Sequence, residues 1–323
     1  MPGWTGEHEW RGPIPFERMP RELDPDQGYV VTANNRLVPD DHPDYLCTDC
    51  HPTHRADRVA ERIERVKGLT AGDMADILRD TDSARAREIV GHIVEAGGDA
   101  GLIQVLDAWD GRMDAGLVAP TVYFRIRQEM TRSLARLSGL DAASRHPAAS
   151  PAPGIPPLNQ LWWTLPELLR EDDTSLLGGS TWTEVIREAV ATVAEGPAPE
   201  PWGEAHLPIF THPLQHLFPD APGAQPPACD PIGGDGDCIC ATGAFPGTGT
   251  RSVYGSVARY VFDLADWDNS RWVVLHGTSG HPGDPHYSDQ NPLWARGELV
   301  AMPYTTAAVD AHAVARMTCE PVR

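Results

Sequence analysis

The spacing of apolar residues changes twice along this chain, and that change limits its fold more than any other feature of the sequence. Residues 28–35 are rich in β-branched and apolar side chains and predict a short strand that ends in two asparagines. From residue 55 to residue 195, apolar side chains recur every three or four positions, as they do in amphipathic helices. Beyond residue 201 the period of two returns, over residues 252–264 and 271–276. We therefore predict an α+β fold in which a large helical insertion separates the strands of one sheet.

Three parts follow from these changes, and they are residues 1–54, 55–200 and 201–323. The first part contains the strand of Asn34, and the second is the helical block. A Pro- and Ala-rich stretch at residues 146–157 interrupts the block and predicts a linker. The third part contains the returning strands, a helix over residues 305–311 and a last strand over residues 314–319.

Two positions in the helical block carry the sequence signature of a helix start. Thr70 is followed three residues later by Asp73, and Thr181 is followed three residues later by Glu184. In this spacing the hydroxyl and the carboxylate satisfy each other's backbone N–H groups at the first turn. We therefore predict that a helix begins directly after each of the two threonines.

The charge of the chain excludes one broad class of partner. It has 26 Lys and Arg residues against 46 Asp and Glu residues, so its formal net charge is 26 − 46 = −20. Binding of phosphate groups needs clustered basic side chains. We therefore expect neither a nucleic-acid partner nor an anionic membrane surface.

The N-terminus and the hydropathy pattern bear on location. Residues 1–10 contain neither a basic cluster nor an apolar stretch, so they predict no signal peptide. No apolar run approaches the ~18–20 residues that span a bilayer, so we expect no membrane association. The sequence by itself assigns the chain to no compartment.

Two of the six cysteines lie in the segment Cys47-Thr48-Asp49-Cys50-His51. The spacing fits the attachment motif of a c-type haem, and the same thiols with His51 and His54 have the ligand types of a zinc site. A third interpretation is a polar loop with two incidental thiols. We favour the third, because an export signal and a second Cys/His pair at zinc-finger spacing are both missing from the sequence.

A series of short segments occurs in a fixed order along the whole chain. They are Glu9–Phe16, Gly28–Arg36, Tyr45–Leu46, Arg55–Val59, Trp202–His206, His212–Leu214, Gly233–Asp235, Asp266–Arg271, Ser279–Gly283, Pro285–Gln290 and Trp294–Glu298. Together these segments resemble the penicillin acylase family of N-terminal nucleophile hydrolases. The resemblance implies a four-layer αββα sandwich, of which this chain would form a part that carries the large helical insertion.

The resemblance also implies a function and a set of partners. Members of the family are made as precursors that cut themselves into two subunits, and the larger subunit begins with a catalytic Ser or Cys. This chain resembles the C-terminal portion of that larger subunit. We therefore expect hydrolysis of the linear amide bond of an acylated small molecule, such as a β-lactam or an acyl-homoserine lactone. The nucleophile-bearing segment and the small subunit would come from sequence outside this chain, and an intact precursor would be periplasmic or secreted.

Two site residues are carried over from the family's motifs. The family uses an Asn in a strand that ends in Asn-Asn to bind the oxyanion, and Asn34 matches it. A family Arg that orients the site is matched best by Arg58, with Arg55 as the alternative. Relatives often bind a structural calcium, mostly through acidic residues in the absent part, so we expect no cofactor in this chain.

Two alternatives and one surface property complete the expectations. The chain could be a catalytically inactive truncated remnant or, less favoured, a metal or haem protein that uses Cys47, Cys50 and His51. If the chain is a part of the family fold, active or not, its strands lack their usual neighbours. They should then show open edges and exposed apolar faces, which promote association.

Overall fold

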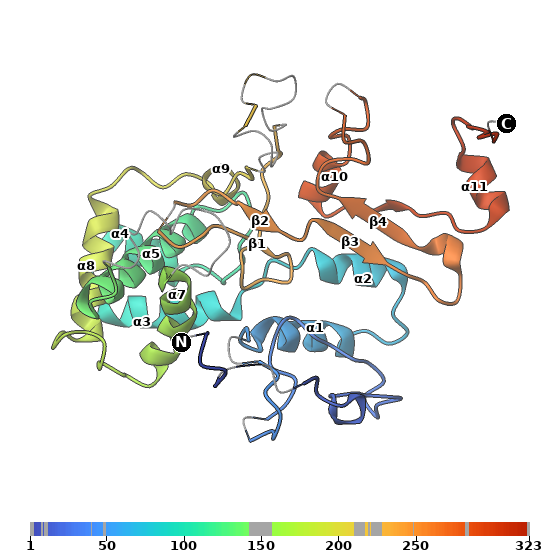
Figure 1. Cartoon of the computed structure of the whole chain (residues 1–323). Helices are drawn as coiled ribbons and strands as arrows, with labels where there is room; N and C mark the ends of the chain where they lie inside the picture. Colours follow the sequence, from blue (N-terminus) through green and yellow to red (C-terminus); the bar gives the residue numbers. More distant parts are fainter. Residues whose placement is uncertain are drawn as a thin grey trace. The chain divides into compact units, whose positions relative to one another are not determined.

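The computed structural model describes residues 3–7, 9, 12–39, 41–47, 50–141, 157–209, 217–218, 220, 228–247, 249–281 and 284–321. It divides into two compact units, residues 1–61 and 62–323, which are described one after the other (Figure 1). The predicted linker at residues 146–157 lies outside the described residues except for Pro157, where helix α7 begins. Among the described residues, no helix is both long enough and apolar enough to cross a bilayer.

The first unit is mostly irregular chain. It contains a short 3-10 helix, η1 (Phe16–Arg18), and the start of helix α1 (His54–Glu64). Residues 28–35 do not form the predicted strand, because their pairing within the described chain is an isolated parallel bridge of Asn35 to His51. A β-branched segment becomes a strand only when a neighbouring strand satisfies its backbone groups.

The second unit begins with the helical block, which matches the predicted periodicity (Figure 1). Its helices are α2 (Ala71–Leu78), α3 (Ala84–Ala96), α4 (Ala100–Asp107), α5 (Ala119–Leu137), α7 (Pro157–Arg170), α8 (Trp182–Ala194) and α9 (Trp202–Ala205). Both predicted capping boxes are present, from Thr70 to Asp73 at α2 and from Thr181 to Glu184 at α8. The helix starts were therefore readable from local sequence.

Helix α5 is the centre of the helical core. It packs against α8, α7, α4 and α9, and it is buried on nearly every side. Tyr123, Ile126, Met130 and Leu134 have no exposed surface. Burial of apolar side chains of this size stabilises the fold by roughly 1.5–3 kcal/mol each, so this block has a complete hydrophobic core of its own.

Two small antiparallel sheets follow the helical block. The strands β1 (Thr242–Gly243) and β2 (Tyr254–Gly255) form one pair, and β3 (Ala258–Val261), β4 (Arg271–Val274) and β5 (Val300–Ala301) form the other sheet in that order. Helix α10 (Asn291–Arg296) packs on β4 and brings Trp294 against Val273 and Leu275. The chain is thus an α+β protein, with strands inside both of the late regions where alternation predicts them.

The C-terminal prediction is half correct. Helix α11 (Thr306–His312) forms where a helix is expected, and the hydroxyl of Thr305 accepts a hydrogen bond from Ala308 N at its start. Residues 314–319 form no strand, and Val314 is 97% exposed. The reason is the same as for residues 28–35, since no strand of the described residues pairs with this segment.

A glycine-rich loop at residues 233–238 joins the two cores of the second unit. Gly234 has φ of 84°, and a Cβ atom there would lie 2.0 Å from the carbonyl oxygen of Cys240. Only glycine fits that conformation and that space. Cys238 packs into the helical core, whereas Cys240, two residues later, packs into the core under the sheet.

The same loop is anchored by a buried arginine of α5. Arg127 donates to the Asp237 carboxylate at 2.7 Å, to the Tyr123 hydroxyl at 3.0 Å and to the Trp162 carbonyl at 2.9 Å. Its guanidinium also stacks over the Trp162 ring at 3.8 Å. Both partners of the ion pair are at least 90% buried, because Arg127 is 1% and Asp237 9% exposed. A buried charge of this kind is tolerated only while it stays paired.

A second buried ionisable group lies beside α9. The Nδ1 atom of His206 donates to the Thr250 carbonyl at 2.7 Å, and its Nε2 atom lies 3.1 Å from the Thr242 hydroxyl. The imidazole stacks on the Trp202 ring at 4.2 Å. Burial lowers the pKa of His206 from 6.5 to about 4, so this histidine is neutral in the folded chain at neutral pH.

We therefore expect His206 to make the fold sensitive to acid. As the pH falls from 6.5 through 4, the unfolded chain binds a proton at His206 that the folded chain does not, which costs roughly 3 kcal/mol of stability. Burial and the Asp237 carboxylate raise the pKa of Asp235 to about 6. The folded chain therefore binds a proton at Asp235 before the unfolded chain does, so acidification stabilises the fold at this residue and offsets the loss at His206.

The contribution of His206 is measured by urea unfolding of the wild type and of His206→Gln at pH 7 and pH 4. The contribution of Asp235 is common to both proteins, so the difference between their losses of stability belongs to His206. The variant should lose roughly 3 kcal/mol less on acidification than the wild type. Equal losses in the two proteins would show that His206 does not titrate in this way.

Candidate active site

Asn34 lies in an unusual backbone conformation in the first unit. Its φ is 63°, in the left-handed region that Asn adopts more readily than other residues with a side chain. Its carbonyl oxygen accepts a hydrogen bond of 2.9 Å from the backbone N–H of His51. The backbone of Asn34 is therefore held by the segment that follows Cys50.

The side chain of Asn34 is oriented by an arginine. Arg55 Nη2 donates to Asn34 Oδ1 at 3.0 Å and to the Ala33 carbonyl at 2.8 Å. Because a guanidinium only donates, it assigns the oxygen of the carboxamide to its own side and leaves the Nδ2 hydrogens as the donors. Within the described part of the chain, no acceptor of an Asn34 Nδ2 hydrogen bond is recorded.

The neighbouring asparagine has a different, local task. Asn35 Oδ1 accepts from the backbone N–H of Ala33 at 2.9 Å, and Asn35 Nδ2 donates to the Arg36 carbonyl at 3.0 Å. These bonds close the turn on itself. Of the two adjacent amides, Asn34 is therefore the exposed one that does not close the turn with its side chain.

Helix α1 carries both candidate arginines. Arg55 is the second residue of the helix and contacts Asn34, whereas Arg58 lies about one turn later and forms an ion pair of 2.7 Å with Glu61. The structure thus brings Arg55 and Asn34 together and records no such contact for Arg58 among the described residues. The orienting role of Arg58 stays a prediction.

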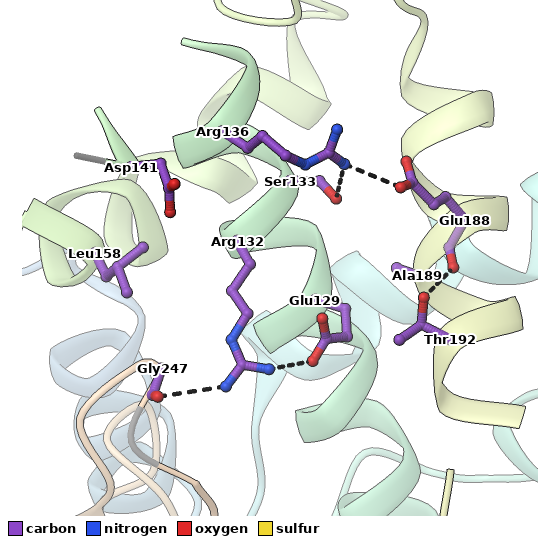
Figure 2. A pocket seen from close by; sticks show the side chains of 10 residues that line it. All are labelled: Glu129, Arg132, Ser133, Arg136, Asp141, Leu158, Glu188, Ala189, Thr192 and Gly247. Carbon is purple, nitrogen blue, oxygen red and sulfur yellow. Dashed lines mark hydrogen bonds and ion pairs between the residues drawn. The ribbon is translucent and has the colours of Figure 1, made fainter. Parts of the chain in front are cut away.

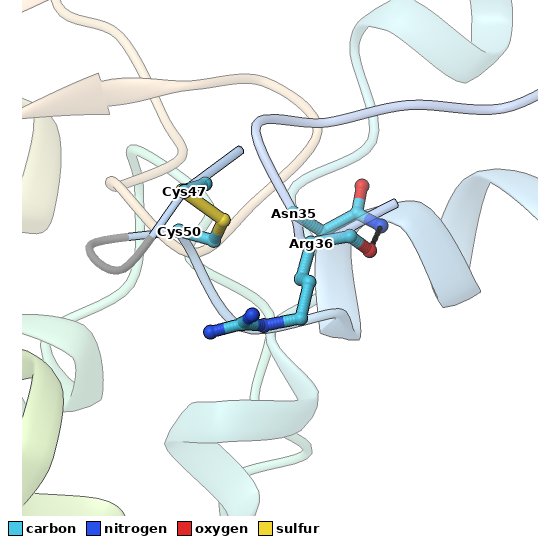
Figure 3. Close-up of a disulfide and its surroundings, with 4 residues drawn as sticks. All are labelled: Asn35, Arg36, Cys47 and Cys50. Atoms are coloured by element: carbon cyan, nitrogen blue, oxygen red, sulfur yellow. Dashed lines mark hydrogen bonds between the residues drawn. A yellow bond between two sulfur atoms is a disulfide. The ribbon is translucent and has the colours of Figure 1, made fainter. Parts of the chain in front are cut away.

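The cysteine motif forms a disulfide between Cys47 and Cys50 (Figure 3). Our interpretation of two incidental thiols is therefore wrong, because the sulfurs are bonded to each other. A disulfide sulfur is not the thiolate that binds zinc or the thiol that attaches a haem. Among the residues that the structure describes, no three His, Cys, Asp or Glu side chains cluster as metal ligands.

A pocket of about 420 Å³ lies in the helical block between α5 and α8 (Figure 2). Its charged side chains pair with one another or with the chain: Arg136 donates to Glu188 at 2.9 Å, and Arg132 pairs with Glu129 and donates to the Gly247 carbonyl. The two hydroxyls that line the pocket are bonded as well, since Ser133 accepts from Arg136 and Thr192 donates to the Glu188 carbonyl. The candidate site is therefore the surroundings of Asn34.

The sequence of this chain is similar to that of known acylases. The family model of penicillin amidase matches residues 1–311. The penicillin acylase 2 proenzyme of Pseudomonas sp. (strain SE83) is 47% identical over 327 residues, which cover 99% of this chain and 42% of that protein. An acyl-homoserine lactone acylase QuiP of Pseudomonas syringae pv. tomato is 22% identical over 94% of this chain and 40% of its own length. The chain spans about two fifths of the length of these relatives.

A solved structure supports the fold. A thermostable penicillin G acylase from Alcaligenes faecalis matches with a TM-score of 0.53 at 18% identity, over 98% of this chain and 61% of that one. This likeness confirms the predicted fold class, a partial N-terminal nucleophile hydrolase sandwich with a helical insertion. With a family model matched over nearly its whole length, the chain belongs to the penicillin amidase family.

Proposed function

We propose that this chain is the oxyanion-binding part of an acylase that hydrolyses the linear amide bond of an acylated small molecule. The observation that carries the proposal is the geometry of Asn34, whose carboxamide oxygen is held by Arg55 so that its N–H groups are available as donors. The relatives' names point to side-chain amides of penicillins or of acyl-homoserine lactones. The higher identity to the penicillin acylase, 47% against 22%, favours a β-lactam substrate.

The proposed chemistry assigns one step to this chain. When a nucleophile attacks an amide carbonyl, the oxygen becomes an oxyanion, and a fixed N–H donor lowers the energy of that state more than that of the substrate. Asn34 Nδ2 would be such a donor, and Arg55 would fix its direction. The N-terminal Ser or Cys that attacks would come from the rest of the precursor, as the resemblance implies.

The position of Asn34 in this chain fits an incomplete site. Asn34 is exposed, whereas an oxyanion donor acts most strongly where water is excluded. More than half of the length of the 47% identical relative lies outside the match. The missing polypeptide would therefore supply both the nucleophile and the cover over Asn34.

The second unit presents a surface on which that polypeptide could dock. Tyr260, Phe262 and Trp272 form an aromatic face on the outer side of the β3–β4–β5 sheet. The Tyr260 ring stacks with Phe262 at 5.8 Å and with Trp272 at 6.2 Å, and Tyr260 and Phe262 are 45% and 57% exposed. The opposite face, which includes Arg259 and Val273, is buried under α10.

The aromatic face has the composition of an interface. Exposed, stacked aromatic side chains bury large apolar areas when a partner covers them. Among the described strands, β3 also lies at the edge of its sheet, next to β4. We assign this surface to an apolar, strand-bearing segment of the missing part of the precursor, because the relatives contain a long polypeptide that this chain lacks.

The function is tested by reconstitution. The chain is co-expressed with the portion of the penicillin acylase 2 proenzyme of Pseudomonas sp. (strain SE83) that it does not match, and chromogenic phenylacetyl, glutaryl and long-chain acyl amides are assayed. We expect no hydrolysis by the chain alone and turnover of at least one substrate by the complex. Turnover by the purified chain alone would contradict the proposed division of the site. A complex that forms and stays inactive would favour the truncated remnant.

The docking surface is tested in the same system with the double variant Tyr260→Ser, Phe262→Ser. Loss of two exposed aromatic anchors should weaken assembly roughly tenfold or more, because such anchors carry most of the binding energy of an interface. The Kd is measured by titrating labelled chain with the proenzyme portion. Tyr304→Ser, which removes an exposed tyrosine that packs on Trp267 instead, is the matched control and should assemble like the wild type. An unchanged Kd in the double variant would contradict the assignment.

A further inference from the structure

The disulfide lies one residue from the contact that holds Asn34. Cys50 is followed directly by His51, and the His51 N–H donates to the Asn34 carbonyl at 2.9 Å. Asn35 forms its parallel bridge with the same His51. Figure 3 shows Asn35 and Arg36 near the two bonded cysteines. The cross-link and the candidate oxyanion donor therefore share one backbone contact.

That contact has little support from regular structure. Among the described residues it is an isolated bridge that belongs to no strand. The segment before Cys47 is fixed by a turn from Pro39 to His42 and by the ion pair of Asp44 with Arg18. In such a segment, the disulfide removes freedom that the residues around His51 would otherwise have.

We propose that the Cys47–Cys50 disulfide positions Asn34, and that its reduction releases the His51 contact and lowers the effectiveness of the oxyanion donor. The inference rests on the proposed function of Asn34. Reduction breaks the S–S bond and adds two electrons and two protons to give two thiols, while a dithiol reductant is oxidised to its own disulfide. The activity of the site would then depend on whether the Cys47–Cys50 disulfide is oxidised or reduced, although the disulfide would contact neither the substrate nor the nucleophile.

The positioning is measured directly in the full chain by amide hydrogen exchange with NMR. The probe is dithiothreitol, and mass spectrometry confirms the gain of two hydrogen atoms on reduction of one disulfide. We expect the His51 amide to exchange roughly tenfold faster in the reduced chain, because a lone bridge opens once its cross-link is removed. The amide of Gly28, which donates to Pro25 O at 2.8 Å in the same unit, should change less than twofold and serves as the internal reference.

Matched variants attribute the response to this disulfide. Cys47→Ser with Cys50→Ser should exchange at the fast rate with or without dithiothreitol. Cys319→Ser, which removes an exposed free thiol, should behave like the wild type. A His51 exchange rate that stays within twofold on complete reduction would overturn the proposal, and so would an air-oxidised chain in which Cys47 and Cys50 carry free thiols.

Kinetics of the reconstituted complex separate positioning from general damage. Reduction should lower kcat several-fold with little change in KM, because Asn34 acts on the transition state. In an Asn34→Ala complex, reduction should have no further effect on kcat. If reduction lowers kcat equally in both complexes, the disulfide does not act through Asn34. The exchange experiment does not depend on catalysis. If the proposed function is wrong but the disulfide does position Asn34, Asn34→Ala will leave kcat unaltered while the His51 amide still exchanges faster on reduction.

Discussion

Replacement of Asn34 by Ala is expected to lower kcat of the reconstituted acylase by a factor of roughly 100–1,000, which corresponds to about 3–4 kcal/mol. The substitution removes the N–H donor that would stabilise the oxyanion, and it leaves the groups that bind the substrate in the ground state. KM should therefore change little. The measurement is steady-state hydrolysis by complexes of equal concentration, checked by analytical size-exclusion chromatography.

Variants of the two arginines of α1 are the controls for that result. Arg55→Ala should lower kcat by a smaller factor, because it frees the Asn34 carboxamide to rotate without removing it. Arg58→Ala, which breaks an ion pair with Glu61, tests the other candidate and should lower kcat more than Arg55→Ala only if Arg58 is the orienting arginine. A large loss with Arg58→Ala and none with Arg55→Ala would transfer the orienting role to Arg58, as the family motif suggests. Full activity of Asn34→Ala would remove the oxyanion role altogether.

The second large effect is on stability. Arg127→Met should lower the free energy of unfolding by roughly 3–5 kcal/mol, because it removes the cation that donates to the buried Asp237 carboxylate at 2.7 Å. The substitution also removes the donors to Tyr123 and to the Trp162 carbonyl. Urea unfolding followed by helical circular dichroism measures the change.

Two further variants show whether the loss of stability in Arg127→Met comes from the unbalanced buried charge. In Arg127→Met combined with Asp237→Leu, much of the lost stability should return, because both charges are replaced by apolar groups. Arg132→Met, which breaks an exposed pair with Glu129 on the same helix, should cost less than about 1 kcal/mol. A loss below about 1 kcal/mol in Arg127→Met would mean that the buried pair does not support the fold.

Sequence predicts the helices of this chain far better than its strands. A helix satisfies its own backbone groups, so the local pattern from Thr181 to Glu184 was enough to place the start of α8. A strand needs a partner, and among the described residues neither 28–35 nor 314–319 has one that forms a ladder. Their side chains are suited to strands, but side-chain type alone does not supply the pairing segment.

The candidate site was only partly readable. Asn34 was found through the family motif, and without it the pair Asn34-Asn35 reads as a turn. That the guanidinium of Arg55 contacts Asn34 depends on where α1 begins relative to the turn, which no local pattern fixes. The Cys47–Cys50 bond was also missed, although a spacing of three residues is common in disulfides and was visible in the sequence.

The loop at residues 233–238 has a consequence for how the second unit responds to binding. Because Cys238 belongs to the helical core and Cys240 to the core under the sheet, neither core can open without displacing the same short segment. The two cores should therefore melt in one cooperative transition, with equal calorimetric and van't Hoff enthalpies. By thermodynamic linkage, a polypeptide that binds the aromatic face would raise the melting temperature of helices that it never touches.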